Sequence, residues 1–201
     1  MYLSRLVMNL AASTARRDLA NAYELHRTLY RCTAGNGDSR LLWRIEPNIQ
    51  SLPVILVQTT EEPDWSPLTM MSPSYLAEPP GSKPYAPVVE RQTVLRFRLR
   101  GNPTVRQAGK RRAISTAKGQ LQWLQRKAEQ GGFRILAVSL HDEQLLTARK
   151  AEHTIQVAAV TFDGQLVVTD PMRFLRTLEE GIGPAKAFGF GLLSIAPPGT
   201  P

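Results

Sequence analysis

A proline-rich stretch divides this 201-residue chain into two halves, and it constrains the fold more than any other feature. Residues 61–90 hold seven of the fifteen prolines. Proline fixes φ and lacks a backbone N–H, so we expect this stretch to be mostly irregular connection. The sequence therefore predicts two domains, residues 1–90 and residues 91–201, each of about 100 residues, which is a common domain size.

The first half has the pattern of a strand, a helix and two further strands. Apolar residues predict strands over 2–8, 41–47 and 53–60. Between the first two strands, apolar and aromatic side chains recur every three or four positions, which predicts one helix over 13–31. Three side chains near its start are candidate N-caps: Ser13, Thr14 and Asp18.

The second half opens on a strand whose side chains alternate. Leu95, Phe97 and Leu99 are expected on one face and arginines on the other, because successive side chains of a strand point to opposite faces. The arginines are Arg96, Arg98 and Arg100. A polar loop is expected over 101–112.

The remaining elements complete a mixed α+β pattern. Asp163-Gly164 predicts the turn of a hairpin, and Asp170 and Gly181 suit the two ends of a helix. We predict two tandem ferredoxin-like domains of RRM-like βαββαβ topology, joined by the proline-rich connection. In order, the remaining elements are a helix over 115–132, a strand over 133–140, a hairpin over 153–170, a helix over 170–181 and a strand over 190–197.

Positive charge is concentrated in one segment. The net charge is +8, and residues 91–128 contain eleven basic residues and no acid, so the rest of the chain sums to 8 − 11 = −3. Folding does not require such local self-repulsion, and a polyanion would relieve it. The pattern favours a nucleic-acid partner, and the alternative is a solvated basic face without a partner.

A glycine-rich segment, GIGPAKAFGFG over 181–191, does not match a nucleotide-cofactor motif. Lys186 stands where a Rossmann fingerprint needs its third glycine, and the segment follows a helix instead of preceding one. A P-loop signature is absent as well. Two interpretations remain open. The backbone at Gly183 and the Lys186 ammonium contact a phosphodiester, or the segment is a turn that packs a helix against a strand.

His26 is the histidine with the most informative surroundings. Tyr23, Arg27 and Tyr30 lie three to four positions from it or from each other, so they share a helix face. One interpretation is an aromatic core stripe with a hydrogen-bonded histidine. The other is metal-free RNA cleavage, in which a 2′-hydroxyl attacks the adjacent phosphorus with histidine as acid or base. Spacing alone does not separate them.

Composition predicts a globular cytoplasmic protein. Hydrophobic residues make up 42% of the chain, enough for a packed core. No apolar run approaches the roughly 20 residues that span a bilayer, and a secretory signal is not expected. Cys32 is the only cysteine, and no histidine or cysteine pair has metal-ligand spacing. We therefore expect no disulfide, no metal and no cofactor.

Several stretches resemble the CasE-type CRISPR-associated endoribonucleases, the repeat-processing subunits of type I-E surveillance complexes. They include MYLSRLVMN, ARRDLANAYELHRTLYR, LRFRLRGNPTVR and GIGPAKAFGFGLLSIAP, in order along the chain. The resemblance implies cleavage of precursor RNA at the 3′ base of each repeat hairpin. It also implies a 2′,3′-cyclic phosphate or 3′-phosphate with a 5′-hydroxyl, and a product that stays bound and joins other subunits. We expect a monomer when the chain is isolated.

The resemblance also implies roles for individual residues. His26 matches the catalytic histidine and Tyr23 the catalytic tyrosine. Arg31 stands where similar proteins can carry lysine, so phosphate contact is retained while a lysine-like proton transfer is not. The alternative is a non-catalytic RNA-binding subunit in which His26 is structural. The expected RNA-binding residues are Arg27, Arg31, Arg96, Arg98, Arg100, Arg106, Lys110, Arg111, Arg112, Arg149, Lys150, Gly183 and Lys186.

Overall fold

The computed structural model describes residues 1–33, 39–46, 52–150 and 153–199, without the side chains at 71, 142–150 and 153–156. The chain forms two compact units. Unit 1 comprises Met1–Ala86 together with two short later segments, Ala148–Thr154 and Ala187–Gly189, and unit 2 comprises the rest. Among the described residues, no helix is both long and apolar enough to cross a bilayer.

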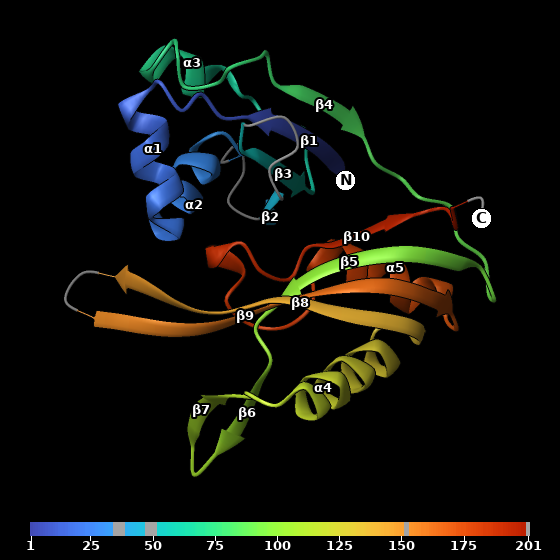
Figure 1. Ribbon diagram of the computed structural model, residues 1–201. Coiled ribbons are helices and arrows are strands. Elements are labelled where there is room, and N and C mark those ends of the chain that lie inside the picture. The colour runs from blue at the N-terminus through green and yellow to red at the C-terminus, as the bar shows by residue number, and fades with distance from the viewer. Residues whose placement is uncertain (34–38, 47–51, 151–152, 200–201) are drawn as a thin grey trace. The chain divides into compact units, whose positions relative to one another are not determined.

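Unit 1 is a four-stranded antiparallel sheet covered by helices (Figure 1). The sheet order is β2-β3-β1-β4. Its core packs Leu25 and Leu29 of the second helix against Leu6, Trp43 and Val57 of the strands. The elements are β1 (Tyr2–Val7), α1 (Ser13–Ala20), α2 (Ala22–Arg31), β2 (Leu41–Glu46), β3 (Val54–Thr59), α3 (Ser66–Met71) and β4 (Gly81–Pro84).

The single helix predicted over 13–31 is wrong, because it is two helices. Asn21 is extended (φ −135°), and its side chain accepts a hydrogen bond from the Tyr23 amide, so it caps α2. The predicted caps of α1 are wrong too, since Ala12 holds that position without a side-chain hydrogen bond. Asparagine competes for the backbone in this way, and the break sets the start of α2.

Asp18 is instead a buried structural carboxylate. It is fully buried and accepts hydrogen bonds from Thr28 Oγ1 (2.7 Å) and from the Tyr75 hydroxyl (2.9 Å). Arg17 also donates to it, at 2.9 Å. Burial, followed by the charge of Asp18, raises the pKa of Tyr75 far above its ordinary value. These bonds tie α1, α2 and the segment around Tyr75 together.

Replacement of Asp18 with alanine is expected to destabilise unit 1 by about 3 kcal/mol, because it leaves two buried hydroxyls and one guanidinium without their acceptor. Urea unfolding followed by tryptophan fluorescence measures the change. Glu62, an exposed acid of the same unit, is the matched control, and its alanine variant is expected to stay within about 0.5 kcal/mol of the original protein. Equal stability of the two variants would show that the Asp18 bonds contribute little.

The proline-rich stretch is more ordered than expected, because it contains α3 and β4. Pro67 lies in the first turn of α3, where a missing N–H costs nothing. Within the described part of the chain, β4 is an edge strand paired with β1, and Pro84 ends it. These two prolines therefore occupy positions that a helix start and a sheet edge tolerate.

Unit 2 repeats the same sheet topology. Its order is β10-β5-β9-β8, so each unit, with its own strands numbered along the chain, has the order 4-1-3-2 of a ferredoxin-like sheet. Leu95, Phe97 and Leu99 are buried, as the alternation predicts. The α+β prediction of two tandem ferredoxin-like domains is confirmed. The elements are β5 (Val94–Gly101), β6 (Thr104–Gln107), β7 (Lys110–Ala113), α4 (Ala117–Gln130), β8 (Phe133–Lys150), β9 (His153–Val168), α5 (Pro171–Glu180), the 3₁₀ helix η1 (Lys186–Phe188) and β10 (Leu193–Ala196).

The turn predicted at Asp163-Gly164 is wrong. Both residues lie within β9, opposite Arg98 and Phe97 of β5. A Cβ at position 164 would lie 2.0 Å from the Ala137 carbonyl oxygen, so glycine here permits a close approach of β8 instead of a reversal. Asp163 meanwhile forms an ion pair with Arg98.

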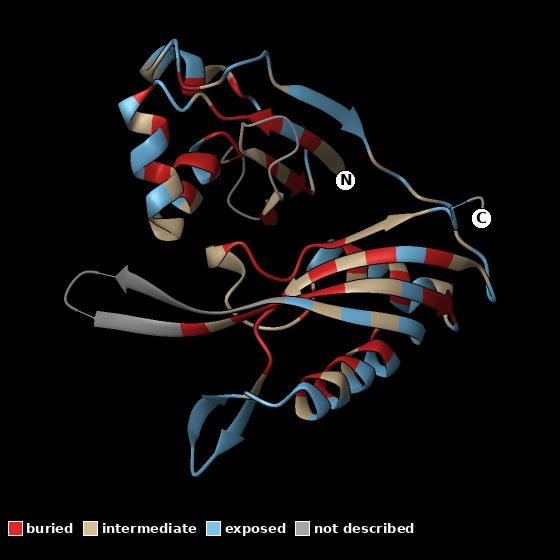
Figure 2. Ribbon diagram, viewed as in Figure 1, coloured by how far each residue is buried: buried red, intermediate tan, exposed pale blue. Residues whose placement is uncertain are grey.

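The polar loop expected over 101–112 is instead a two-stranded hairpin, β6–β7. Its turn is Ala108-Gly109, and both residues have positive φ (49° and 76°), as tight hairpin turns require. Figure 2 shows the hairpin exposed over almost its whole length. Such a hairpin has no buried face, so no alternation of apolar residues marks it in the sequence.

Candidate RNA-binding and cleavage site

The second helix presents His26 at the edge of the unit 1 core. Leu25, Thr28 and Leu29 of α2 are buried, whereas His26 is half-buried. The Trp43 indole N–H donates to His26 Nδ1 at 3.3 Å, and the Tyr30 ring lies 6.2 Å from the imidazole. Burial lowers the pKa of His26, so the ring is neutral near pH 7. A neutral, partly accessible imidazole is suited to proton transfer.

Three more of the predicted site residues lie on α2, the helix of His26. Tyr23 is half-buried in the first turn of α2, three positions from His26. Arg27 is exposed and pairs with Glu24 at 3.2 Å, and Arg31 is exposed in the last turn. The side chains of the predicted residues Arg149 and Lys150 lie outside the described residues.

The three arginines of β5 have partners within unit 2. Arg98 makes two hydrogen bonds to Asp163, at 2.7 and 2.9 Å. Arg96 donates to the Pro197 carbonyl at 3.0 Å, and the Arg100 guanidinium lies 5.6 Å from the centre of the Phe190 ring. Their charges are thus partly engaged in the fold.

The arginines of the β6–β7 hairpin are all exposed, whereas two of the three on β5 are only partly exposed. Arg106 and Arg111 are directly opposite each other in the β6–β7 ladder, and both are exposed. Like charges at directly opposite positions destabilise a sheet. Lys110 and Arg112 alternate with Arg111 along β7 and so point to the other face. The arrangement costs stability in the free protein and suits an anionic ligand.

A hollow of about 490 Å³ lies beside these two arginines. Its wall includes the predicted residue Lys186 and one that the prediction missed, Lys127 of α4. Four cations and no acid are therefore found among the described residues that line it. The spacing of Lys127 along α4 contains no signal for this role, because only folding brings α4 to the hairpin. The lining residues are Thr104, Val105, Arg106, Arg111, Trp123, Lys127, Gly181, Gly183, Pro184 and Lys186.

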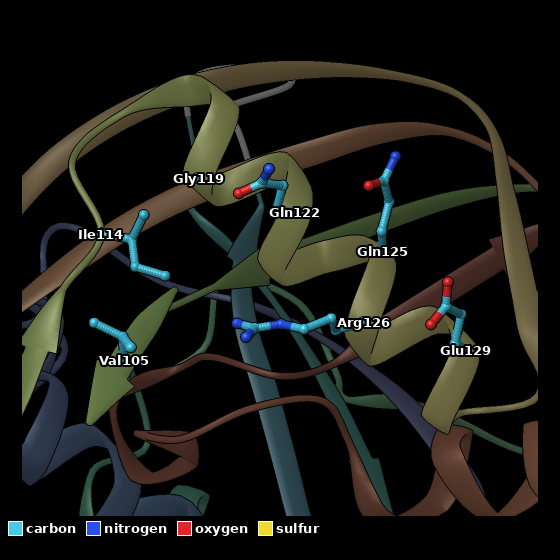
Figure 3. A pocket seen from close by; sticks show the side chains of 7 residues that line it. All are labelled: Val105, Ile114, Gly119, Gln122, Gln125, Arg126 and Glu129. Carbon is cyan, nitrogen blue, oxygen red and sulfur yellow. The ribbon is translucent and has the colours of Figure 1, made fainter. Parts of the chain in front are cut away.

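A second hollow, of about 500 Å³, lies on α4 and has a different character (Figure 3). Val105 and Ile114 lie opposite polar side chains of the helix. These are Gln122, Gln125, Arg126 and Glu129. With one cation, one acid and two amides, this lining does not favour a phosphate, so the first hollow is the candidate site for a polyanion.

The glycine-rich segment packs against two indole rings. Gly183 has φ +80°, and a Cβ there would lie 2.8 Å from the Trp123 ring. Gly189 also has φ +80°, and a Cβ there would lie 2.8 Å from the Trp43 ring. Gly189 therefore fits the interpretation in which the segment is a packing turn. Gly183 packs against Trp123 and also lines the basic hollow. No pattern in the sequence marks either tryptophan for this role, because tertiary packing alone brings them to the loop.

The chain is similar to known CRISPR-associated proteins over nearly its whole length. Residues 1–197 match the model of a family described as CRISPR associated protein. The CRISPR-associated endoribonuclease Cse3 of Thermus thermophilus is 45% identical over 98% of this chain and all of its own length. The CRISPR system Cascade subunit CasE of Escherichia coli K12 is 27% identical, again over 98% of this chain and all of its own length. A structure of Thermus thermophilus Cse3 bound to an RNA representing a pre-cleavage complex has a TM-score of 0.90, at 46% identity and 98% coverage of both chains. The chain therefore belongs to this family of CRISPR-associated proteins.

Proposed function

We propose that this chain is an endoribonuclease that binds CRISPR repeat hairpins and cuts precursor RNA at the 3′ base of the stem. The observation that carries the proposal is His26, a neutral, half-buried imidazole on the same helix as Tyr23. The similarity to Cse3, which is named as an endoribonuclease, supports it.

The cleavage chemistry uses the RNA's own 2′-hydroxyl as nucleophile. The hydroxyl oxygen attacks the adjacent phosphorus, the bond to the 5′-oxygen breaks, and the leaving oxygen takes up a proton. His26 and Tyr23 are the groups assigned to these proton movements. The products are a 2′,3′-cyclic phosphate, which hydrolyses to a 3′-phosphate, and a 5′-hydroxyl. No step in this scheme requires a metal ion.

The basic hollow and the hairpin are assigned to the RNA stem. A-form RNA is bound mainly through its backbone and shape, and the hollow offers four cations to phosphates. Lys110 and Arg112 extend the basic surface along β7. Arginine reads guanine edges most often, so Arg106 or Arg111 also has the chemistry for base contact near the cut. Gly183 contributes close backbone approach beside Lys186.

The other predicted contacts supplement this surface. Arg27 and Arg31 project from α2, the helix of His26, and suit the phosphates next to the cut. Arg96, Arg98 and Arg100 lie along β5, and Arg149 and Lys150 near the end of β8. Because the β5 arginines already have partners, we expect each to contribute less than a hairpin arginine.

The product is proposed to stay bound and to enter a multi-subunit complex. The Escherichia coli relative is named as a Cascade subunit, and solved structures of Cse3 are named as RNA-bound. We propose that the isolated chain is a monomer and acts in the cytoplasm.

The decisive experiment is single-turnover cleavage in EDTA. A hairpin RNA from the host's own repeat, incubated with excess protein and EDTA, is expected to be cut once. Mass spectrometry of the 5′ fragment is expected to give a mass one water below that of the linear 3′-phosphate. An RNA with a single 2′-deoxy substitution at the cleaved linkage is the matched control and is expected to remain intact. Cleavage that needs Mg²⁺ would contradict the scheme, and tight binding without cleavage would indicate the non-catalytic RNA-binding alternative.

A further inference from the structure

The Trp43–His26 hydrogen bond fixes which imidazole nitrogen carries the proton. The Trp43 indole N–H lies 3.3 Å from His26 Nδ1. An indole can only donate, so Nδ1 must be an unprotonated acceptor. A neutral imidazole has one N–H, which in this arrangement is on Nε2.

Trp43 is held firmly enough to impose this choice. Its side chain is almost fully buried (1% exposed), and it belongs to the unit 1 core with Leu41 and Val57. Val57 is its partner in the β2–β3 ladder. Gly189 lies against the ring, where a Cβ would come within 2.8 Å. With strands on one side and the loop on the other, the indole has little room to rotate away.

We propose that Trp43 is a positioning residue that holds His26 in the Nε2–H tautomer, so that the neutral ring presents a hydrogen-bond donor to the RNA. This inference rests on the proposed function for its RNA partner. It assigns the Nε2 N–H as a hydrogen-bond donor to a phosphate oxygen, where it stabilises the negative charge that develops on phosphorus. Because Nε2 already carries a proton, the neutral ring does not take up the 2′-hydroxyl proton. The Tyr23 hydroxyl, the other group assigned to the proton movements, then accepts that proton and passes its own to the leaving 5′-oxygen.

The same bond also disfavours the imidazolium. Burial lowers the pKa of His26. Protonation at Nδ1 would bring the ring N–H against the indole N–H and lose the hydrogen bond, so we expect the indole to lower this pKa further. The lowered pKa traces to burial and to none of the neighbouring charges. The neighbouring titratable groups are Tyr23, Glu24, Arg27 and Tyr30 on α2, and Arg44 and Glu46 on β2, the strand of Trp43. Removal of the indole N–H alone should therefore raise this pKa.

The test replaces Trp43 with 3-benzothienylalanine, which has the shape of tryptophan with sulfur in place of the N–H. In RNA-free protein, ¹⁵N-histidine NMR is expected to show a His26 pKa higher by about 0.7 unit, the equivalent of one hydrogen bond. The His26-dependent limb of the single-turnover pH–rate profile is expected to move to higher pH by the same amount. In the original protein, His26 is expected to show a protonated Nε2 and an unprotonated Nδ1.

The matched control is the same replacement at Trp65. This residue is also buried in the unit 1 core, but its N–H donates to Ser82 at 2.9 Å, so the His26 pKa is expected to stay unchanged. An unchanged His26 pKa after replacement of Trp43, or an equal rise after replacement of Trp65, would overturn the proposal. Because the titration needs no RNA, its outcome is separate from the cleavage test of the proposed function.

Discussion

The variant His26→Ala is expected to bind repeat RNA normally and to cut it about 10²- to 10⁴-fold more slowly, which is the usual contribution of a positioned acid–base group. The imidazole lies at the surface edge of α2, so its loss removes one hydrogen bond from Trp43 without opening the core. Single-turnover rates with excess protein measure the chemical step. Filter binding in EDTA measures affinity independently.

A matched histidine variant distinguishes chemistry from general perturbation. His141 is exposed on β8, and His141→Ala is expected to cut at the original rate. Equal rates for His26→Ala and the original protein would remove His26 from the mechanism. A large loss of affinity in His26→Ala, with unchanged cutting of the RNA that does bind, would make it a binding residue instead.

The double variant Arg106→Gln, Arg111→Gln is expected to weaken repeat binding roughly 100-fold or more, because each charge-assisted hydrogen bond contributes about 1.5–3 kcal/mol. The slope of log affinity against log salt is expected to become shallower by about 1.5–2 units, as two phosphate contacts are lost. Binding isotherms at several salt concentrations measure both quantities. Stability should not fall, since the substitutions relieve the repulsion of an opposed like-charged pair.

The control for the hairpin variant changes the same charge elsewhere. Arg173 and Arg176 are exposed on α5, and their replacement with glutamine also lowers the net charge by two. This control tests whether overall charge explains the loss. If both double variants weaken binding equally, the basic hollow has no special role and binding is diffuse.

Local patterns predicted the element type correctly for most elements with one buried face, although they missed the short helix α3, which buries Leu68. The alternation of β5 and the apolar runs of β2 and β3 reflect contacts with the core, and those strands were found. The hairpin β6–β7 has no buried face, so nothing in its composition marked it as strand. Asp163-Gly164 misled the prediction because close backbone approach and a tight turn both require glycine.

The candidate site was predictable in its charges but not in its packing. His26 and the basic residues of the hairpin are visible in the sequence as residue types in a helical or clustered pattern. Lys127, Trp43 and Trp123 gain their roles only when distant segments meet. The spacing of residues along one helix or strand contains no information about contacts between distant segments.

The contact between Gly189 and Trp43 also bears on the order of synthesis. Residues 187–189 belong to unit 1, although most of that unit is made first. During translation, the wall that confines the indole cannot form until residue 189 has left the ribosome. A nascent amino-terminal fragment therefore lacks the part that completes the surroundings of its tryptophan, and Trp43 reaches its final packing only after residue 189 has been made.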